Sequence, residues 1–120
     1  MLYTACISAI GKSQAKMKHY YVMNGHGSDV VVPDKLDLDQ YRNGVVTWQG
    51  FKLNYSMKLM RPEAEEWMRG VSVEAVREDA ILVSDEENGK HCYRILLAET
   101  MINTFSGQMN LHYMGELDRS

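Results

Sequence analysis

The side chains best suited to chemistry in this chain of 120 residues are two cysteines and four histidines. A thiol beside an imidazole can act as a nucleophile with its base, and both groups bind zinc when they are closely spaced. No pair here has a Cys-x-x-Cys or His-x-x-x-His spacing, and His91 and Cys92 would point to opposite faces of a strand. The spacing therefore predicts no metal, no cofactor and no catalytic residue. A pair assembled across strands, such as Cys6 or Cys92 with His112, stays open as the weakest alternative.

A glycine-rich segment, Gly25-His26-Gly27-Ser28, is the second candidate. A dinucleotide-binding turn would need a third glycine at position 30 and a helix after it, but Val30 begins a β-favouring run. A nucleophilic serine would also need a strand-to-helix turn, which the sequence does not predict. Because binding residues concentrate on loops, we expect these four residues to form a loop that contacts a ligand or partner.

Tyrosine and methionine are abundant, with seven and nine copies respectively. Tyrosine offers apolar area with a polar tip, and methionine adapts to varied contacts, so both suit binding surfaces. The two adjacent tyrosines at 20 and 21 would present one ring to each face of a strand. The alternative is that these rings fill the core. The aromatic residues predicted to contact a partner are Tyr20, Tyr21, Tyr41, Trp48 and Tyr113.

Composition narrows the classes of partner. The chain is 45% hydrophobic and carries a net charge of −3 with its charges mixed, so nucleic acid is not expected as a partner. No window approaches the roughly 20 apolar residues of a membrane helix, and the N-terminus has no secretory pattern. We therefore expect a cytoplasmic protein with no membrane contact and two reduced thiols.

The elements that would position these residues are mostly predicted as strands. Phe51 to Leu59 alternates apolar and polar residues with period two, after a β-favouring run from Val45 to Trp48. One helix is predicted from Pro62 to Arg69, with Gly70 ending it. The stretch from Asp34 to Arg42 is expected as a loop or a single helical turn, and Asp85 to Lys90 as a loop with an Asn88-Gly89 turn. The other predicted strands are Leu2–Ile10, Met17–Met23, Val30–Val32, Val71–Ala75, Ala80–Val83, His91–Ala98 and Gln108–Met114.

These elements predict a mainly β fold (β-rich α+β), a single domain over residues 1–120 in which an antiparallel meander forms a barrel or sandwich with one short helix. The first functional hypothesis is a non-catalytic interaction protein that binds and inhibits or neutralises a partner protein. The second is a β-barrel that binds a small ligand, either a nucleotide or an apolar metabolite, with Lys12, Lys18 and Arg94 as anion contacts. The third is a small enzyme that uses His and Cys. Homo-oligomerisation is compatible with each of them.

Overall fold

The computed structural model describes residues 1–86 and 91–117 and contains a four-stranded sheet in which every strand is parallel to its neighbours. Its strands lie in the order β2-β3-β1-β4, so β1 and β3 are central. The strands are β1 (Leu2–Cys6), β2 (Lys18–Tyr21), β3 (Ala80–Ser84) and β4 (Tyr113–Leu117). The α-helices are α1 (Lys35–Arg42), α2 (Trp48–Leu59), α3 (Pro62–Arg77) and α4 (Tyr93–Phe105), and the short 3-10 helices are η1 (Ile7–Ala9), η2 (Lys12–Gln14) and η3 (Asp29–Val31).

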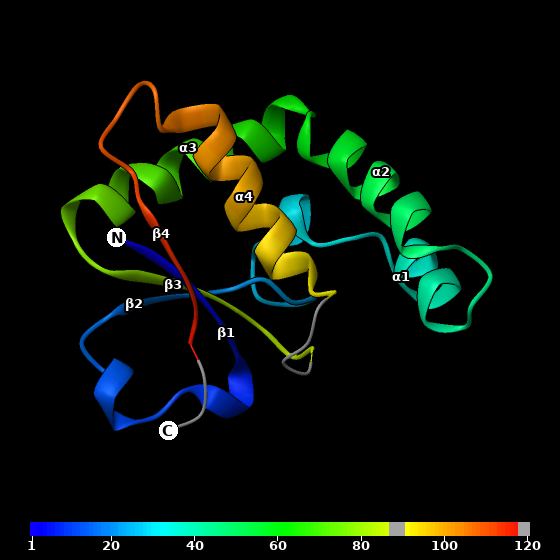
Figure 1. The fold of residues 1–120 in the computed structure, drawn as a ribbon, viewed down its shortest axis with the longest axis horizontal. Helices are drawn as coiled ribbons and strands as arrows, with labels where there is room; N and C mark the ends of the chain where they lie inside the picture. Colours follow the sequence, from blue (N-terminus) through cyan, green and yellow to red (C-terminus); the bar gives the residue numbers. More distant parts are fainter. Residues whose placement is uncertain (87–90, 118–120) are drawn as a thin grey trace.

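The two faces of the sheet are covered differently. The α-helices lie on one side of the strands, and the chain between β1 and β2 lies on the other (Figure 1). On the helical side, Leu2 and Leu82 belong to the main core together with residues of α2, α3 and α4. On the opposite side, Ile81 and Val83 pack against Ala9 and the residues around it. Because both faces are covered, β3 is buried along its whole length, as is usual for a parallel strand.

The mainly β, antiparallel fold predicted from the sequence is wrong: the structure is an α/β fold with a parallel sheet, and it is neither a barrel nor a sandwich. The connections explain the difference. Between β2 and β3 the chain forms α1, α2 and α3, and between β3 and β4 it forms α4. Helical crossovers of this length bring the next strand back in the same direction, whereas an antiparallel meander needs short loops.

The alternating stretch from Phe51 to Leu59 is the clearest error, because it lies in helix α2. Phe51, Tyr55 and Leu59 are buried, whereas the two apolar residues between them are exposed. In an alternating stretch every second apolar residue is four positions from the last, and residues four apart lie on the same face of a helix. The same alternation therefore also fits a helix. Helix α2 begins after Thr47, whose Oγ1 accepts a hydrogen bond from the backbone N–H of Gly50 at 3.1 Å. The β-favouring run from Val45 to Trp48 is accordingly not a strand.

Two further predicted strands are helical, because their buried residues also recur at helical spacing. The helix predicted from Pro62 begins there, but it passes through Gly70 and reaches Arg77, so Val71–Ala75 is its last part. The spacing of the buried residues Ala64, Met68, Val71 and Ala75 is helical throughout. The stretch His91–Ala98 runs into α4, whose core positions recur every four residues, at Tyr93, Leu97, Met101 and Phe105.

Of the remaining predicted elements, three strands agree with the structure and the others differ from it. Strands lie within the predicted ranges Leu2–Ile10 and Met17–Met23, and β3 covers Ala80–Val83. Val30–Val32 is not a strand, since η3 occupies most of it. Within the stretch Asp34–Arg42, Lys35–Arg42 forms the eight-residue helix α1 rather than a loop or single turn. Strand β4 begins at Tyr113, later than the predicted Gln108–Met114. The predicted Asn88-Gly89 turn lies outside the described residues.

Within the described ranges, no helix has the length and apolar character needed to cross a membrane.

Candidate functional site at the carboxyl edge of the sheet

The carboxyl ends of β1 and β3 form the place where this topology favours a site. Cys6 and Ser84 end these neighbouring strands and are paired in register. After β1 the chain turns to one face of the sheet, and after β3 it reaches α4 on the other face (Figure 1). Where successive connections leave on opposite faces, a crevice opens at the carboxyl edge, and ligands of open parallel sheets bind there.

A buried arginine lies beside this junction. Arg94, in the first turn of α4, is fully buried, and its guanidinium contacts both carboxylate oxygens of Glu116 in β4, with Nε donating to Oε1 at 3.0 Å. Its Nη1 donates to Ser84 Oγ and to the backbone oxygen of Glu86, each at 2.9 Å. Burial acts against the charged form, but the hydrogen bond and the charge of Glu116 outweigh it and raise the pKa of Arg94. A buried charge of this kind requires such pairing.

Glu86 is the titratable group of the junction. Its side chain is 12% exposed, and its Oε1 accepts the backbone N–H of Tyr93 at 2.9 Å and the hydroxyl of Ser84 at 3.4 Å. Burial raises the pKa of Glu86 to about 7, and the charge of Asp85 adds to the rise. The Tyr93 N–H and the charges of Arg94 and Arg42 oppose it. A carboxyl group with this pKa can take up and release a proton near neutral pH.

Both thiols lie near this edge and both are buried and free of a disulfide. The hydroxyl of Ser8 donates to Cys6 Sγ at 3.2 Å, and Cys92 precedes the first turn of α4. A pair of Cys6 with His112 is not formed, because the backbone oxygen of His112 binds Leu2 at the opposite end of β1. Leu2 and Cys6 are four residue steps apart along the strand, roughly 13 Å. The ring of His91, next to Cys92, instead stacks on Trp48 at a centroid distance of 4.5 Å.

A small cavity of about 170 Å³ opens beside Glu86. One part of its wall is apolar and consists of Met23, Val32 and Leu38. The rest is polar and consists of Asn24, Arg42, Asp85 and Tyr93. The hydroxyl of Tyr93 donates to the backbone oxygen of Val22 at 2.6 Å, and burial is the main cause of the raised pKa of that hydroxyl.

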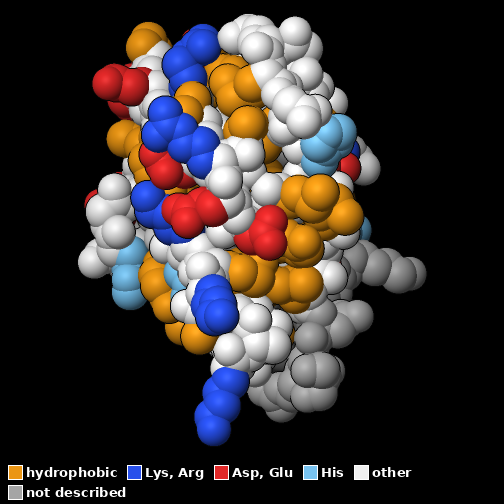
Figure 2. Space-filling model, turned by 90° about the vertical axis from the view of Figure 1, so that its left-hand side faces the viewer, with side chains coloured by type: hydrophobic (Ala, Val, Ile, Leu, Met, Phe, Trp, Pro, Cys, Tyr) orange, Lys and Arg blue, Asp and Glu red, His pale blue; other side chains and the backbone are white. Residues whose placement is uncertain are grey.

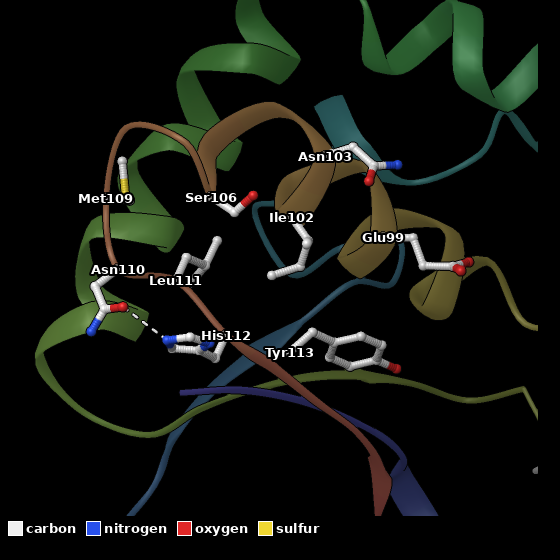
Figure 3. A pocket seen from close by; sticks show the side chains of 9 residues that line it. All are labelled: Glu99, Ile102, Asn103, Ser106, Met109, Asn110, Leu111, His112 and Tyr113. Carbon is white, nitrogen blue, oxygen red and sulfur yellow. Dashed lines mark hydrogen bonds between the residues drawn. The ribbon is translucent and has the colours of Figure 1, made fainter.

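A larger hollow, of about 510 Å³, lies between α4 and the segment that leads into β4 (Figure 3). Several of its polar groups are already paired with one another or with the sheet. His112 Nε2 and Asn110 Oδ1 are 2.8 Å apart, and the hydroxyls of Tyr113 and Thr4 are 2.7 Å apart. Glu99 and Asn103 complete its polar lining from α4. This hollow is larger than the cavity beside Glu86, and Ser106 adds a hydroxyl to its polar lining. Among the described residues, however, its lining contains no lysine or arginine, so it offers a ligand no guanidinium or ammonium group, whereas Arg42 lines the smaller cavity.

The binding residues predicted from the sequence lie in four separate places. Tyr21 lies with the glycine-rich loop, since its ring is 5.5 Å from that of His26 and its backbone oxygen accepts the hydroxyl of Ser28 at 2.6 Å. Gly25 and Gly27, in the same loop, have φ values of 85° and 81°. Tyr20 points to the helical side of β2 and meets Trp67 edge-on.

The remaining two places lie elsewhere in the fold. Tyr41 and Trp48 pack together at 5.3 Å, joining α1 to the start of α2. Tyr113 is in β4, on the wall of the larger hollow. Sequence reasoning missed Glu86, Ser84 and Glu116, and it took Arg94 as an anion contact rather than as a partner of buried carboxylates. The available signal was Arg94 itself, because a charged residue within the apolar run Tyr-Arg-Ile-Leu-Leu-Ala requires a buried counter-charge.

No known protein family, curated protein or solved structure matches this chain. Over residues 1–86 and 91–117, no cluster of three or more His, Cys, Asp or Glu side chains is arranged to hold a metal ion. Function therefore has to be inferred from the geometry of the carboxyl edge.

Proposed function

We propose that the protein binds a small ligand in the cavity of about 170 Å³ at the carboxyl edge of its sheet. The observation that carries the proposal is the position of this cavity at the carboxyl edge, where its lining includes Met23 and Asn24 after β2 and Asp85 after β3, next to the junction of β1 and β3. The fully buried Arg94 and the carboxyl of Glu86 with its raised pKa lie at this junction. Buried charge and perturbed pKa values gather at functional sites more often than elsewhere.

Glu86 gives this site a chemical property beyond shape. Arg42 and Asp85 both line the cavity, and the charge of each acts on the Glu86 carboxyl. A charged ligand in contact with either side chain would therefore change the proton occupancy of Glu86 near neutral pH. Binding is accordingly expected to be coupled to uptake or release of a proton.

A matched pair of tryptophan variants on helix α1 tests the proposal. Leu38→Trp places a large ring in the cavity, whereas Leu36→Trp adds the same ring to an exposed position of the same helix. The melting temperature of each protein is measured with free amino acids, dicarboxylates, polyamines and nucleoside monophosphates. A specific ligand raises the melting temperature by mass action.

We expect at least one of the four classes to stabilise the wild type and Leu36→Trp but not Leu38→Trp. A flat response of the wild type to all four classes would contradict the proposal. So would a response that persists undiminished in Leu38→Trp. If Leu38→Trp fails to fold, amide chemical shifts of Asn24 and Tyr93 in the wild type answer the same question, because both residues line the cavity.

Binding of a partner protein is a second candidate, favoured by one face of α2. Leu53, Met57 and Met60 are 63%, 61% and 79% exposed and follow one another at helical spacing. Exposed apolar stripes of this kind suit contact with another protein. Elsewhere, as on the face drawn in Figure 2, hydrophobic side chains are interspersed with acidic and basic ones.

Two charged substitutions test this second candidate. The variant Leu53→Glu/Met57→Glu should lose a partner that copurifies with the wild type from the native host. The control Lys52→Glu/Ser56→Glu alters exposed positions of the same helix outside the stripe and should keep it. Equal recovery of the partner by both variants would exclude this face as the contact surface.

A further inference from the structure

Two opposite charges share the small cavity at the carboxyl edge. Arg42 ends helix α1 and Asp85 directly follows β3, and both line the cavity with Tyr93. Both side chains are exposed. Among the described residues, neither side chain makes an ion pair within 4.0 Å or a hydrogen bond. A cation and an anion are thus both available at the rim of one site.

The two charges act on the same neighbour. Arg42 lowers the pKa of Glu86 and Asp85 raises it, so both lie within electrostatic reach of that carboxyl. Arg42 and Asp85 are nevertheless too far apart to bond directly. A ligand between them that carried one charge would satisfy only one of the two side chains, whereas a ligand with both charges would satisfy both.

The rest of the cavity limits the size and polarity of the ligand. Met23, Val32 and Leu38 provide an apolar wall, and Asn24 adds an amide that can donate to an oxygen or accept from an N–H. Pockets for drug-sized ligands begin at about 300 Å³, so a cavity of about 170 Å³ suits a smaller ligand.

From this arrangement we propose that the cavity binds an α-amino acid with an apolar side chain. Arg42 pairs with the ligand carboxylate, Asp85 pairs with its ammonium group, and Met23, Val32 and Leu38 contact the side chain. This assignment rests on the proposed function, because it names the ligand class of the same site. No covalent step is involved.

The test uses L-leucine and two analogues that each lack one charge. 4-Methylpentanoate lacks the ammonium group, and 3-methylbutylamine lacks the carboxylate. Dissociation constants are measured by isothermal titration calorimetry. Because Arg42 and Asp85 are exposed, each charge pair with the ligand contributes up to about 1 kcal/mol, and each analogue should bind about two- to fivefold more weakly than leucine.

Variants of the protein provide the complementary half of the test. Arg42→Gln should weaken leucine binding about two- to fivefold while leaving the affinity for 3-methylbutylamine unchanged. Asp85→Asn should weaken leucine binding to the same extent while leaving the affinity for 4-methylpentanoate unchanged. The controls Lys35→Gln and Asp39→Asn remove one positive and one negative charge from α1 at residues outside the cavity. Neither control should change the affinity for leucine or for either analogue.

The possible results distinguish the ligand class from the existence of a ligand site. If both analogues bind as tightly as leucine, or if Arg42→Gln and Asp85→Asn bind leucine as the wild type does, the assignment of the ligand class is wrong. If leucine does not bind but another class stabilises the wild type and not Leu38→Trp, the cavity is a ligand site for a different molecule. If no class binds, the assignment and the proposed function both fail.

Discussion

Ion pairs lie at both edges of the sheet, but those of Arg94 at the carboxyl edge are buried and those of Glu74 at the amino edge are exposed. At the amino edge, Glu74 is 3.6 Å from Lys18 and 3.8 Å from Arg77, and these side chains are all at least one-third exposed. At the carboxyl edge, Arg94 is fully buried between two acids, and the side chain of its main partner, Glu116, is 18% exposed. Water screens the first set and is largely excluded from the second, so the same side-chain types have different energetic consequences.

The carboxyl edge also contains a group that exchanges a proton near neutral pH. This group is the carboxyl of Glu86, and burial of this side chain raises its pKa to about 7. A protein gains little in stability from an acid that is costly to ionise. The position of Glu86 at a junction of the kind where parallel sheets bind ligands is the more economical explanation for its burial.

Removal of Arg94 should produce the largest difference between the two edges. Arg94→Met leaves the carboxylate of Glu116 buried without its partner, and breaking a buried pair costs about 3–5 kcal/mol. Arg77→Met at the amino edge removes a cation that is 72% exposed and should cost less than about 0.5 kcal/mol. Urea denaturation measures both. The double variant Arg94→Met/Glu116→Leu should recover part of the loss, and equal costs at the two edges would contradict the comparison.

The next largest effect is the dependence of stability on pH. Because the folded-state pKa of Glu86 is about 7 and its ordinary value is 4.5, the folded protein retains this proton over a range where the unfolded chain has lost it. The contribution of Glu86 is therefore fully present below pH 4.5 and is lost as the pH rises to about 7. At about 1.4 kcal/mol per pH unit, the loss approaches about 3 kcal/mol.

Glu86→Gln should abolish this dependence. Its free energy of unfolding should equal that of the wild type near pH 4.5 and exceed it by up to about 3 kcal/mol at pH 8, measured by urea denaturation at intervals between. Glu65→Gln, a change at an exposed side chain of α3, should follow the wild type at every pH. If Glu86→Gln kept the wild-type slope, a different group would have to be responsible for it.

The sequence was informative where a pattern has one structural meaning. A short apolar run between polar residues predicted β3, and proline followed by acidic residues predicted the start of α3. The alternation from Phe51 to Leu59 has two meanings, and the residue types that distinguish them point to a helix. Between Trp48 and Leu59 there is no β-branched residue, while leucine, methionine, lysine and glutamine are good helix formers.

The site was less accessible from sequence because its members come from distant segments. Ser84 and Glu86 follow β3, Arg94 is in α4, and Glu116 is in β4, 22 positions beyond Arg94. Their proximity depends on β1 lying between β3 and β4, which an antiparallel meander would not produce. The charge of Arg94 in an apolar segment could have indicated a buried acid, but it could not have indicated which one.

A single hydroxyl at the carboxyl edge should have a smaller effect. Tyr93→Phe removes the donor to the backbone oxygen of Val22, and the loss of a buried hydrogen bond of this kind costs about 1–2 kcal/mol. Tyr3→Phe is the control, since within the described ranges its hydroxyl makes no hydrogen bond, and it should change stability by less than about 0.5 kcal/mol. Thermal unfolding of both variants tests this, and equal shifts would indicate that Tyr93 acts through packing alone.

The smallest effect is expected from the acid that joins the exposed pairs of the amino edge. Glu74→Gln removes both the contact with Lys18 and the contact with Arg77, yet we expect a change of less than about 0.5 kcal/mol that shrinks further in high salt. Urea denaturation at about 0.05 and 1 M salt measures it. A cost near that of Arg94→Met would mean that the charged pairs of the amino edge contribute as much to stability as those of the carboxyl edge. Exposure would then not be what distinguishes the two edges, and the burial of Arg94 and Glu86 would no longer single out the carboxyl edge as the functional one.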